Sequence, residues 1–223
     1  RLFFVLYERG YMKKPIIAIV GRPIVSESGR QMVATYLEVC EVITAFGGIP
    51  LQISLSNINT LTKEDQEDII RIIQLCNGIL LQGGSDFYDY DIFVAQKAHE
   101  LDLPTLGICL GMQTMACAFH GELGRIKHHQ SLKKYVHPID INPQSQLFKI
   151  LPKQQLMVNS RHQEVVLNTD LYVCARAEDG SIEAVEDTNK RFYLGVQWHP
   201  ESMISYNSDA RKLIETFIAC CRH

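Results

Sequence analysis

Four short apolar runs are bounded by glycine or proline, and each has the length of a buried strand. They cover residues 15–21, 50–55, 78–81 and 104–108. Apolar residues at helical spacing occupy the segments between them, namely 32–46, which ends at Gly47-Gly48, then 63–76 with acidic residues at its start, and 90–101. This alternation predicts a three-layer α/β fold, in which helices flank a doubly wound, mostly parallel sheet with right-handed crossovers.

After residue 120 the pattern changes to short alternating runs. Asp179-Gly180 is predicted to be a hairpin turn between strands at 171–177 and 181–186, and another strand is expected at 192–196. We expect these strands to extend the sheet in antiparallel orientation. Apolar residues at helical spacing predict a closing helix over 208–220.

One domain is expected, because a chain of 223 residues commonly folds as a single α/β unit. The first predicted strand is directly preceded by a segment typical of a natural N-terminus, Met12-Lys13-Lys14-Pro15. We therefore assign the domain to residues 12–223 and expect residues 1–11 to be an upstream extension.

Composition narrows the functional class. Hydrophobic residues make up 46% of the chain, charged residues 21%, and the formal net charge is -3, so a strongly basic nucleic-acid-binding protein is not expected. No apolar run approaches the roughly 18 residues that a membrane span needs. Seven cysteines without a CxxC pair, most of them in apolar runs, suit a reducing cytoplasm. The oligomeric state is left open, and a homodimer is one option.

The strongest chemical signal is Gly107-Ile108-Cys109-Leu110-Gly111, between a predicted strand and a predicted helix. Such a turn strains the backbone of its central residue, and glycines two positions to either side allow the close approach that it requires. The helix dipole and the free N–H groups at its start favour a thiolate. Alone, the motif also fits a buried cysteine in a tight turn.

Two further motifs follow strands. In Gly195-Val196-Gln197-Trp198-His199-Pro200-Glu201, the histidine could act as a general base and the carboxylate could fix its tautomer. Gly83-Gly84 follows the strand at 78–81, where exposed backbone N–H groups could help to form an oxyanion hole. A lone histidine or a plain glycine turn would be the simpler interpretation of either motif by itself.

Together and in this order, the three motifs resemble the signatures of class I glutamine amidotransferases, whose fold is flavodoxin-like. Further segments resemble the branch that includes γ-glutamyl-γ-aminobutyrate hydrolase, and the resemblance runs from about Lys14 to the C-terminus. These segments are Tyr36 before Gly47-Gly48-Ile49-Pro50, Gly83-Gly84-Ser85-Asp86 with Tyr90, Val158-Asn159-Ser160-Arg161-His162-Gln163 and Asp179-Gly180-Ser181-Ile182-Glu183-Ala184.

The resemblance implies a role for each matching residue. Cys109 would attack a γ-glutamyl carbonyl, His199 would relay the proton and Glu201 would orient His199. The N–H groups of Gly84 and Leu110 would hold the oxyanion. Gly83, Gln113 and the backbone near Ser160 and Arg161 would bind the glutamyl head. No cofactor is implied, and the expected partner is a small γ-glutamyl substrate.

Two departures from the hydrolase branch leave the acceptor side of the substrate open. Leu110 follows the nucleophile where that branch commonly has arginine, and the insert after the glycine pair covers only residues 87–103. The leading hypothesis is a self-sufficient hydrolase that releases glutamate through a cysteine thioester. The alternative is a glutaminase subunit that delivers ammonia to a separate synthetase, since Leu110 is usual there. A chaperone, sensor or peptidase of the same architecture is a third interpretation.

A histidine-rich stretch, His128-His129 and His137 with His120 nearby, could suggest a metal site. No thiolate or carboxylate joins these residues at a recognised spacing, and the region reads as an irregular loop. We therefore predict no metal ligands and expect this loop to border the active-site mouth.

Overall fold

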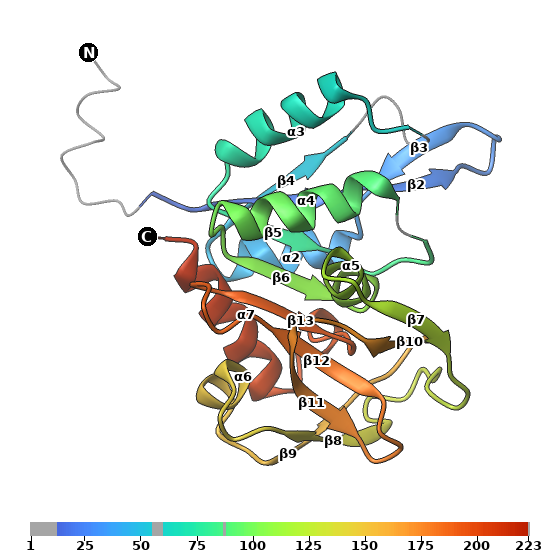
Figure 1. Cartoon of the computed structure of the whole chain (residues 1–223), viewed down its shortest axis with the longest axis vertical. Helices are drawn as coiled ribbons and strands as arrows, with labels where there is room; N and C mark the ends of the chain where they lie inside the picture. Colours follow the sequence, from blue (N-terminus) through green and yellow to red (C-terminus); the bar gives the residue numbers. More distant parts are fainter. Residues whose placement is uncertain (1–12, 55–59, 87, 223) are drawn as a thin grey trace.

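A nine-stranded sheet forms the centre of the molecule in the computed structural model, which describes residues 13–54, 60–86 and 88–222 (Figure 1). The expected extension at 1–11 lies outside the described residues. From one edge to the other, the sheet consists of β4 (Ile49–Ile53), β1 (Ile16–Val20), β5 (Gly78–Leu81), β6 (Thr105–Ile108), β13 (Tyr193–Val196), β12 (Ile182–Glu186), β11 (Tyr172–Ala177), β8 (His137–Ile141) and β9 (Gln155–Val158).

The sheet has a parallel half and an antiparallel half. β4, β1, β5, β6 and β13 run parallel, and β12, β11, β8 and β9 continue the sheet in antiparallel orientation. The antiparallel prediction was wrong for the strand at 192–196, because β13 pairs in parallel with β6, with Val196 opposite Ile108. This pairing brings the carboxyl ends of β6 and β13 to the same edge.

Helices cover both faces, which confirms the three-layer prediction. Alternate residues of β1 divide between the two sides, as the pleat of a strand requires. Ile17 and Ile19 pack with α2 (Leu37–Ala45), α6 (Gln146–Ile150) and α7 (Ser208–Cys220). Ala18 and Val20 pack with the helices of the other face, which are α3 (Lys63–Gln74), α4 (Asp89–Glu100) and α5 (Leu110–Ala118).

The first predicted helix was placed too early. Residues 32–34 belong to a hairpin of β2 (Arg22–Val25) and β3 (Gln31–Ala34), and helix α2 begins only at Leu37. Gly29, with φ of 78°, allows the tight turn between the two strands. A second pair that the sequence did not predict joins β7 (Glu122–Arg125) to β10 (Glu164–Asn168).

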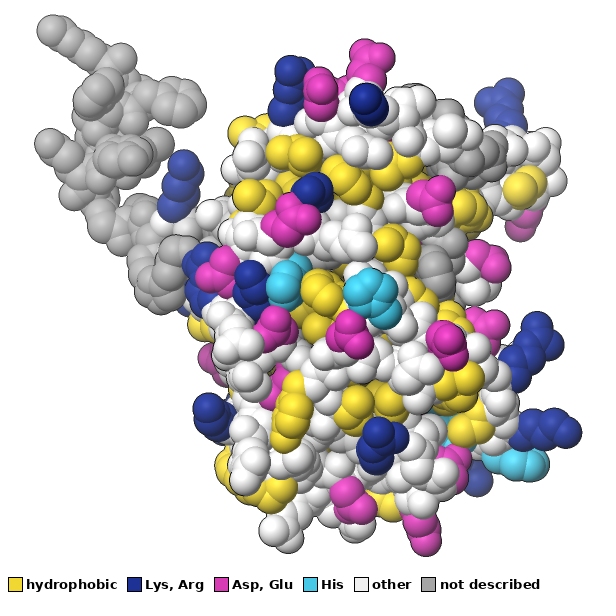
Figure 2. All heavy atoms as spheres, in the orientation of Figure 1, with side chains coloured by type: hydrophobic (Ala, Val, Ile, Leu, Met, Phe, Trp, Pro, Cys, Tyr) yellow, Lys and Arg dark blue, Asp and Glu magenta, His cyan; other side chains and the backbone are white. Residues whose placement is uncertain are grey.

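Two further features of the molecule are the charge distribution on its surface and the length of its helices. Acidic and basic side chains are interspersed over the face shown in Figure 2. Among the described residues, no helix combines the length and apolar character that crossing a bilayer requires.

Candidate active site

Cys109 lies in a strained turn between β6 and α5. Its φ is 53°, a left-handed value that costs a non-glycine residue roughly 1–2 kcal/mol. The Cys109 N–H donates to the carbonyl oxygen of Val196 at 2.8 Å, which ties the turn to β13. A Cβ atom on Gly111 would lie 2.0 Å from the Leu81 carbonyl oxygen, so only glycine fits there. The sequence-predicted elbow is therefore present.

His199 and Glu201 follow β13 at the same edge of the sheet. The Nδ1 atom of His199 lies 2.6 Å from Oε1 of Glu201, which begins the short 3-10 helix η1 (Glu201–Met203). Asn159 holds the His199 backbone from both sides, because its Oδ1 accepts from the His199 N–H at 2.8 Å and its Nδ2 donates to the His199 carbonyl at 2.9 Å. The imidazole orientation is thus fixed by the chain as well as by the carboxylate.

The electrostatics of the site favour a protonated His199. Burial lowers its pKa, but the Glu201 carboxylate and a hydrogen bond with Cys109 outweigh burial and raise the pKa to about 10. An imidazolium beside the sulfur stabilises a thiolate. Burial raises the pKa of six other thiols, which are Cys40, Cys76, Cys117, Cys174, Cys220 and Cys221. Those six are correspondingly poor nucleophiles at neutral pH.

The two residues predicted to supply the oxyanion donors lie next to each other. Leu110 is the first residue of α5, and the N–H groups of a first helical turn have no acceptor within their own helix. A Cβ atom on Gly84 would lie 3.0 Å from Cδ2 of Leu110, and one on Gly83 would lie 3.1 Å from Cε1 of His199. The glycine pair therefore lets the backbone approach Leu110 and His199 closely.

A buried ion pair that the sequence did not predict braces this glycine loop. Arg22 makes a two-pronged contact with Asp91, at 2.7 and 2.8 Å, and also donates to the Asp86 carbonyl at 3.2 Å. The Asp91 carboxylate in addition accepts from the Tyr88 N–H at 2.8 Å at the start of α4. Because 69 residues separate Arg22 from Asp91, no local pattern could have revealed the pair.

A cleft with two lobes opens at Cys109. Gly84, Ser85, Cys109 and Arg161 line both lobes. The first, of about 270 Å³, is completed by Gln113, Arg125, Gln130, His162, Gln163 and Glu164. The second, of about 250 Å³, is completed by Tyr36, Glu38, Gly83, His199 and Glu201. Arg161 donates to the Ser202 hydroxyl at 3.0 Å, and that hydroxyl donates to Glu38 at 2.9 Å.

The predicted head-binding residues differ in position. Gly83 and Arg161 line the cleft, and Gln113 lines its first lobe while donating to the Glu164 carbonyl at 3.0 Å. Ser160 is different, because it is fully buried, its hydroxyl donates to the His129 carbonyl, and it lines neither lobe. The prediction concerned the backbone near Ser160, and it stays a prediction, whereas the buried Ser160 side chain supports the loop that carries His129.

The histidine-rich stretch is also arranged differently from the prediction. His129 and His137 come together with His162 and with a carboxylate, Glu183, whereas His120 pairs with Asp170 at 2.8 Å elsewhere. Neither His162 nor Glu183 was connected to the histidine-rich stretch at the sequence level, because they follow it by more than 20 residues.

A cysteine on a strand-to-helix elbow, with a carboxylate-bound histidine at the end of the neighbouring parallel strand, defines an α/β protein of the cysteine-hydrolase class. Residues 86–201 match the family model Peptidase C26. A Rickettsia prowazekii protein described as glutamine amidotransferase-like is 30% identical over 233 residues, covering 72% of this chain and 80% of that protein. The chain belongs to the Peptidase C26 family of class I glutamine amidotransferase-like hydrolases.

Other similar proteins include parts of larger enzymes. GMP synthase [glutamine-hydrolyzing] of Francisella tularensis is 31% identical over 153 residues, which is 68% of this chain and only 28% of that enzyme. Among solved structures, the glutaminase domain of Trypanosoma brucei CTPS with bound acivicin has a TM-score of 0.70 at 20% identity, covering 93% of this chain and 94% of that one.

A Thermoplasma acidophilum protein, described as one of the subunits of GMP synthase, has a TM-score of 0.67 at 17% identity, covering 94% and 95% of the two chains. Both structures confirm the predicted fold. The comparisons establish the family and leave the γ-glutamyl-γ-aminobutyrate hydrolase branch a prediction.

Proposed function

We propose that this protein is a glutaminase, which hydrolyses the γ-amide of glutamine through a thioester on Cys109 and supplies ammonia to a separate synthetase. The observation that carries the proposal is the arrangement of Cys109, His199 and Glu201 at the second lobe of the cleft, with the polar first lobe opening from the same cysteine. Glutamine hydrolysis appears in the names of the Francisella GMP synthase and the trypanosomal glutaminase domain, which supports this substrate over a larger amide.

The chemistry follows from the positions of these groups. The Cys109 thiolate attacks the γ-carbonyl carbon, and the N–H groups of Gly84 and Leu110 stabilise the negative charge that develops on its oxygen. The His199 imidazolium gives its proton to the departing nitrogen, and ammonia leaves. Neutral His199 then takes a proton from water, which attacks the thioester. Glutamate is released and the thiolate–imidazolium pair is restored, with Glu201 holding the ring throughout.

The first lobe has the polarity that a glutamyl head requires. Arg125 and Arg161 line it and can bind the α-carboxylate, while the Glu164 side of the lobe suits the α-ammonium group. Arg125 and Glu164 lie opposite each other in the β7–β10 pair. The small two-stranded sheet thus carries both charged residues on neighbouring strands.

The experiment is to incubate the purified full chain with glutamine and to measure glutamate and ammonia release. Hydroxylamine is added in a parallel reaction, because it intercepts a thioester and yields γ-glutamyl hydroxamate. Cys109→Ala should form neither product. If the wild-type protein gives no hydroxamate, either alone or with a cell extract that could supply a synthetase, the proposal is wrong.

A second candidate is hydrolysis of a larger γ-glutamyl amide such as γ-glutamyl-γ-aminobutyrate. The second lobe favours it, because about 250 Å³ beside Cys109 is more space than departing ammonia requires. A panel of γ-glutamyl amines, compared with glutamine by kcat/KM, separates the two candidates. Tyr36 lines this lobe, so Tyr36→Ala should change the ratio of the two kcat/KM values if the larger amide is the substrate.

A further inference from the structure

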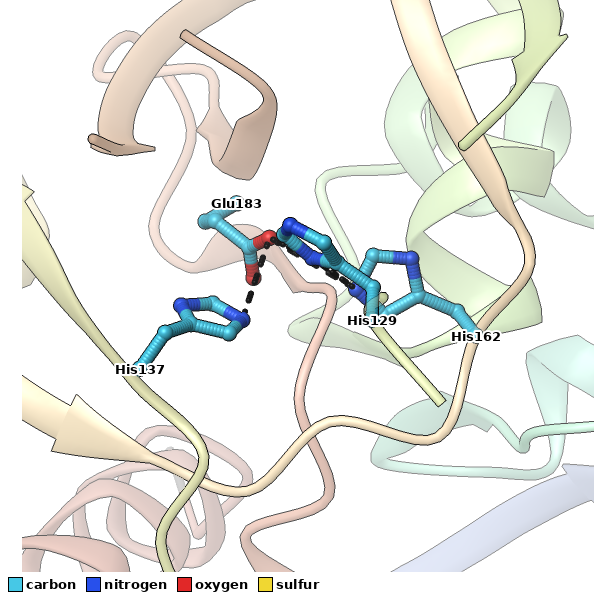
Figure 3. A group of neighbouring side chains, drawn as sticks. All are labelled: His129, His137, His162 and Glu183. Atoms are coloured by element: carbon cyan, nitrogen blue, oxygen red, sulfur yellow. Dashed lines mark hydrogen bonds and ion pairs between the residues drawn. The ribbon is translucent and has the colours of Figure 1, made fainter. Parts of the chain in front are cut away.

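Three histidines and one glutamate converge beside the first lobe of the cleft, which His162 lines (Figure 3). His129 lies in the loop after β7, His137 begins β8, His162 precedes β10, and Glu183 is in β12. Oε1 of Glu183 lies 3.5 Å from Nδ1 of His129, 3.8 Å from Nε2 of His137 and 3.6 Å from Nε2 of His162. Nδ1 of His129 and Nε2 of His162 are 3.2 Å apart.

The opposite nitrogen of each ring is bound to an acceptor. Nε2 of His129 lies 3.0 Å from Oδ2 of Asp179. Nδ1 of His162 lies 2.9 Å from the Glu164 carbonyl, and Nδ1 of His137 lies 3.1 Å from the Pro138 carbonyl. Each outer nitrogen therefore carries the proton in a neutral ring, and the inner nitrogen presents a lone pair to Glu183. This is the arrangement that orients metal-binding histidines in proteins.

The cluster also contains buried polar atoms without hydrogen bonds. Within the described part of the chain, Nε2 of His137 and Oε2 of Glu183 have no hydrogen-bond partner. Glu183 is completely buried. An unsatisfied buried carboxylate oxygen costs stability unless a donor or a cation meets it. The Ser181 hydroxyl donates to Oε1 of Glu183 at 3.5 Å, while the three imidazole lone pairs face that carboxylate and, in these tautomers, none of the three rings donates to it.

Protons are the competing way to balance this site. The hydrogen bond to Glu183 raises the pKa of His129, although burial opposes it. Burial acts to raise the pKa of Glu183, but its contacts with His129, His162 and His137 bring that pKa below its usual value. A proton on His129 satisfies its contact with His162 and leaves Nε2 of His137 unpartnered. A single divalent cation would meet the three inner nitrogens, including the unpartnered Nε2 of His137, together with the Glu183 carboxylate.

We propose that His129, His137, His162 and Glu183 bind one Zn²⁺ ion. Bonds of about 2.0–2.1 Å in a tetrahedral site place neighbouring ligand atoms about 3.3–3.4 Å apart. Four of the six separations between ligand atoms, at 3.2, 3.5, 3.6 and 3.8 Å, are near that edge length, and all six are within 4.8 Å, so binding an ion requires only small shifts of the side chains. Three imidazoles and one carboxylate suit zinc better than Mg²⁺ or Ca²⁺, which prefer oxygen ligands.

The ion has a structural role, because four protein ligands leave no open position for water or substrate. It joins the loop after β7 and the segment before β10 to the central sheet. Both segments supply residues that line the first lobe, including Gln130 and His162. The metal site therefore shapes the pocket wall, and its existence does not depend on which γ-glutamyl compound is hydrolysed.

The test uses the full chain with Cys109→Ala, which removes the thiol that could itself bind zinc beside His199. After treatment with a chelator, zinc uptake is measured by elemental mass spectrometry and affinity by competition with a chromophoric chelator. Co²⁺ is the spectroscopic probe, since four-coordinate Co²⁺ absorbs visible light strongly. Glu183→Gln and His137→Gln are compared with His128→Gln, an exposed histidine next to the cluster.

The expected result is one zinc per chain, with affinity lowered at least about 100-fold in Glu183→Gln and His137→Gln and within about threefold in His128→Gln. Loss of a group that merely orients a ligand costs about 10–100-fold, so loss of a ligand should cost no less. Circular dichroism establishes that the variants fold. If Glu183→Gln does not fold, the zinc affinity of His137→Gln tests the proposal, because His137 is less buried than Glu183 and its substitution disturbs the fold less. Absence of zinc uptake, or equal affinity in all folded variants, would overturn the proposal in favour of a proton-balanced cluster.

Discussion

Replacement of Glu201 by glutamine tests the electrostatic account of the active site. The substitution keeps the shape of the side chain and allows an amide oxygen to accept from Nδ1 of His199, which now lies 2.6 Å from Oε1. It removes the negative charge. The change therefore separates the geometry of the His199 contact from its electrostatic contribution.

The magnitude follows from the pKa of His199. The difference between the usual value of about 6.5 and the raised value of about 10 corresponds to about 5 kcal/mol in favour of the imidazolium. Burial opposes protonation, and the Glu201 charge is the largest contribution that favours it. Without that charge, the pKa of His199 should fall from about 10 toward its usual value, because burial then opposes protonation with less to balance it. Loss of a positioned acid and base lowers kcat by about 10²–10⁴-fold.

The sign of the pH dependence is fixed by the direction of this change. Because the pKa of His199 is higher in the folded protein than in the unfolded chain, its protonation stabilises the fold. This contribution is complete below about pH 6.5 and is lost as the pH rises through about 10. In Glu201→Gln, the imidazolium is lost at a lower pH. The Cys109 thiolate then loses its cationic partner, so nucleophilicity between pH 7 and 9 should fall.

The assay is the rate of Cys109 alkylation by iodoacetamide as a function of pH, followed by peptide mass spectrometry. Burial raises the pKa of the other six thiols, which lowers their background reaction. Glu201→Asp serves as the matched control, because it retains the negative charge and shortens the side chain by one methylene group. An unchanged alkylation profile and unchanged turnover in Glu201→Gln would refute the reasoning.

Three further predictions concern the scaffold of the site. Gly111→Ala should destabilise the protein by about 3 kcal/mol or more in chemical denaturation, because its Cβ would lie 2.0 Å from the Leu81 carbonyl oxygen; Gly29→Ala, with open space around it, should cost only about 1 kcal/mol. Asp91→Asn should cost about 3–5 kcal/mol by leaving the Arg22 charge buried and unpaired, and an unchanged denaturation midpoint would contradict this. Gly83→Ala should lower kcat about 10- to 100-fold with little change in melting temperature, because its Cβ would press on the imidazole at 3.1 Å; full activity would contradict it.

The sequence predicted the parts of the site that depend on local structure. Cys109 was identifiable because an elbow needs small residues at fixed positions around its central residue. His199 and Glu201 were identifiable because both follow a buried strand and are only two residues apart. Their proximity followed from the resemblance to a known family and required no knowledge of the strand order. The assigned roles remain predictions that the variants above test.

The parts that were missed depend on long-range pairing. Arg22 and Asp91 are 69 residues apart, and His129 and His162 are 33 apart, so their contacts exist only after the sheet has formed. The hairpin at 22–34 was misread because Met32 fits both a helical and an alternating apolar pattern. The orientation of β13 depends on its neighbour β6, which no periodicity within residues 192–196 can reveal.

The insertion of β13 beside β6 has a consequence for the chain while it is being synthesised. Cys109 and its neighbour Gln197 are 88 residues apart, so the elbow is made long before the strand that carries the base. Parallel pairing over such a separation forms late, because the entropy cost of closing the loop comes before the strand contacts that offset it. The emerging polypeptide therefore has a thiol without its imidazole. The order of synthesis therefore delays the contact between Cys109 and His199 until β13 has docked.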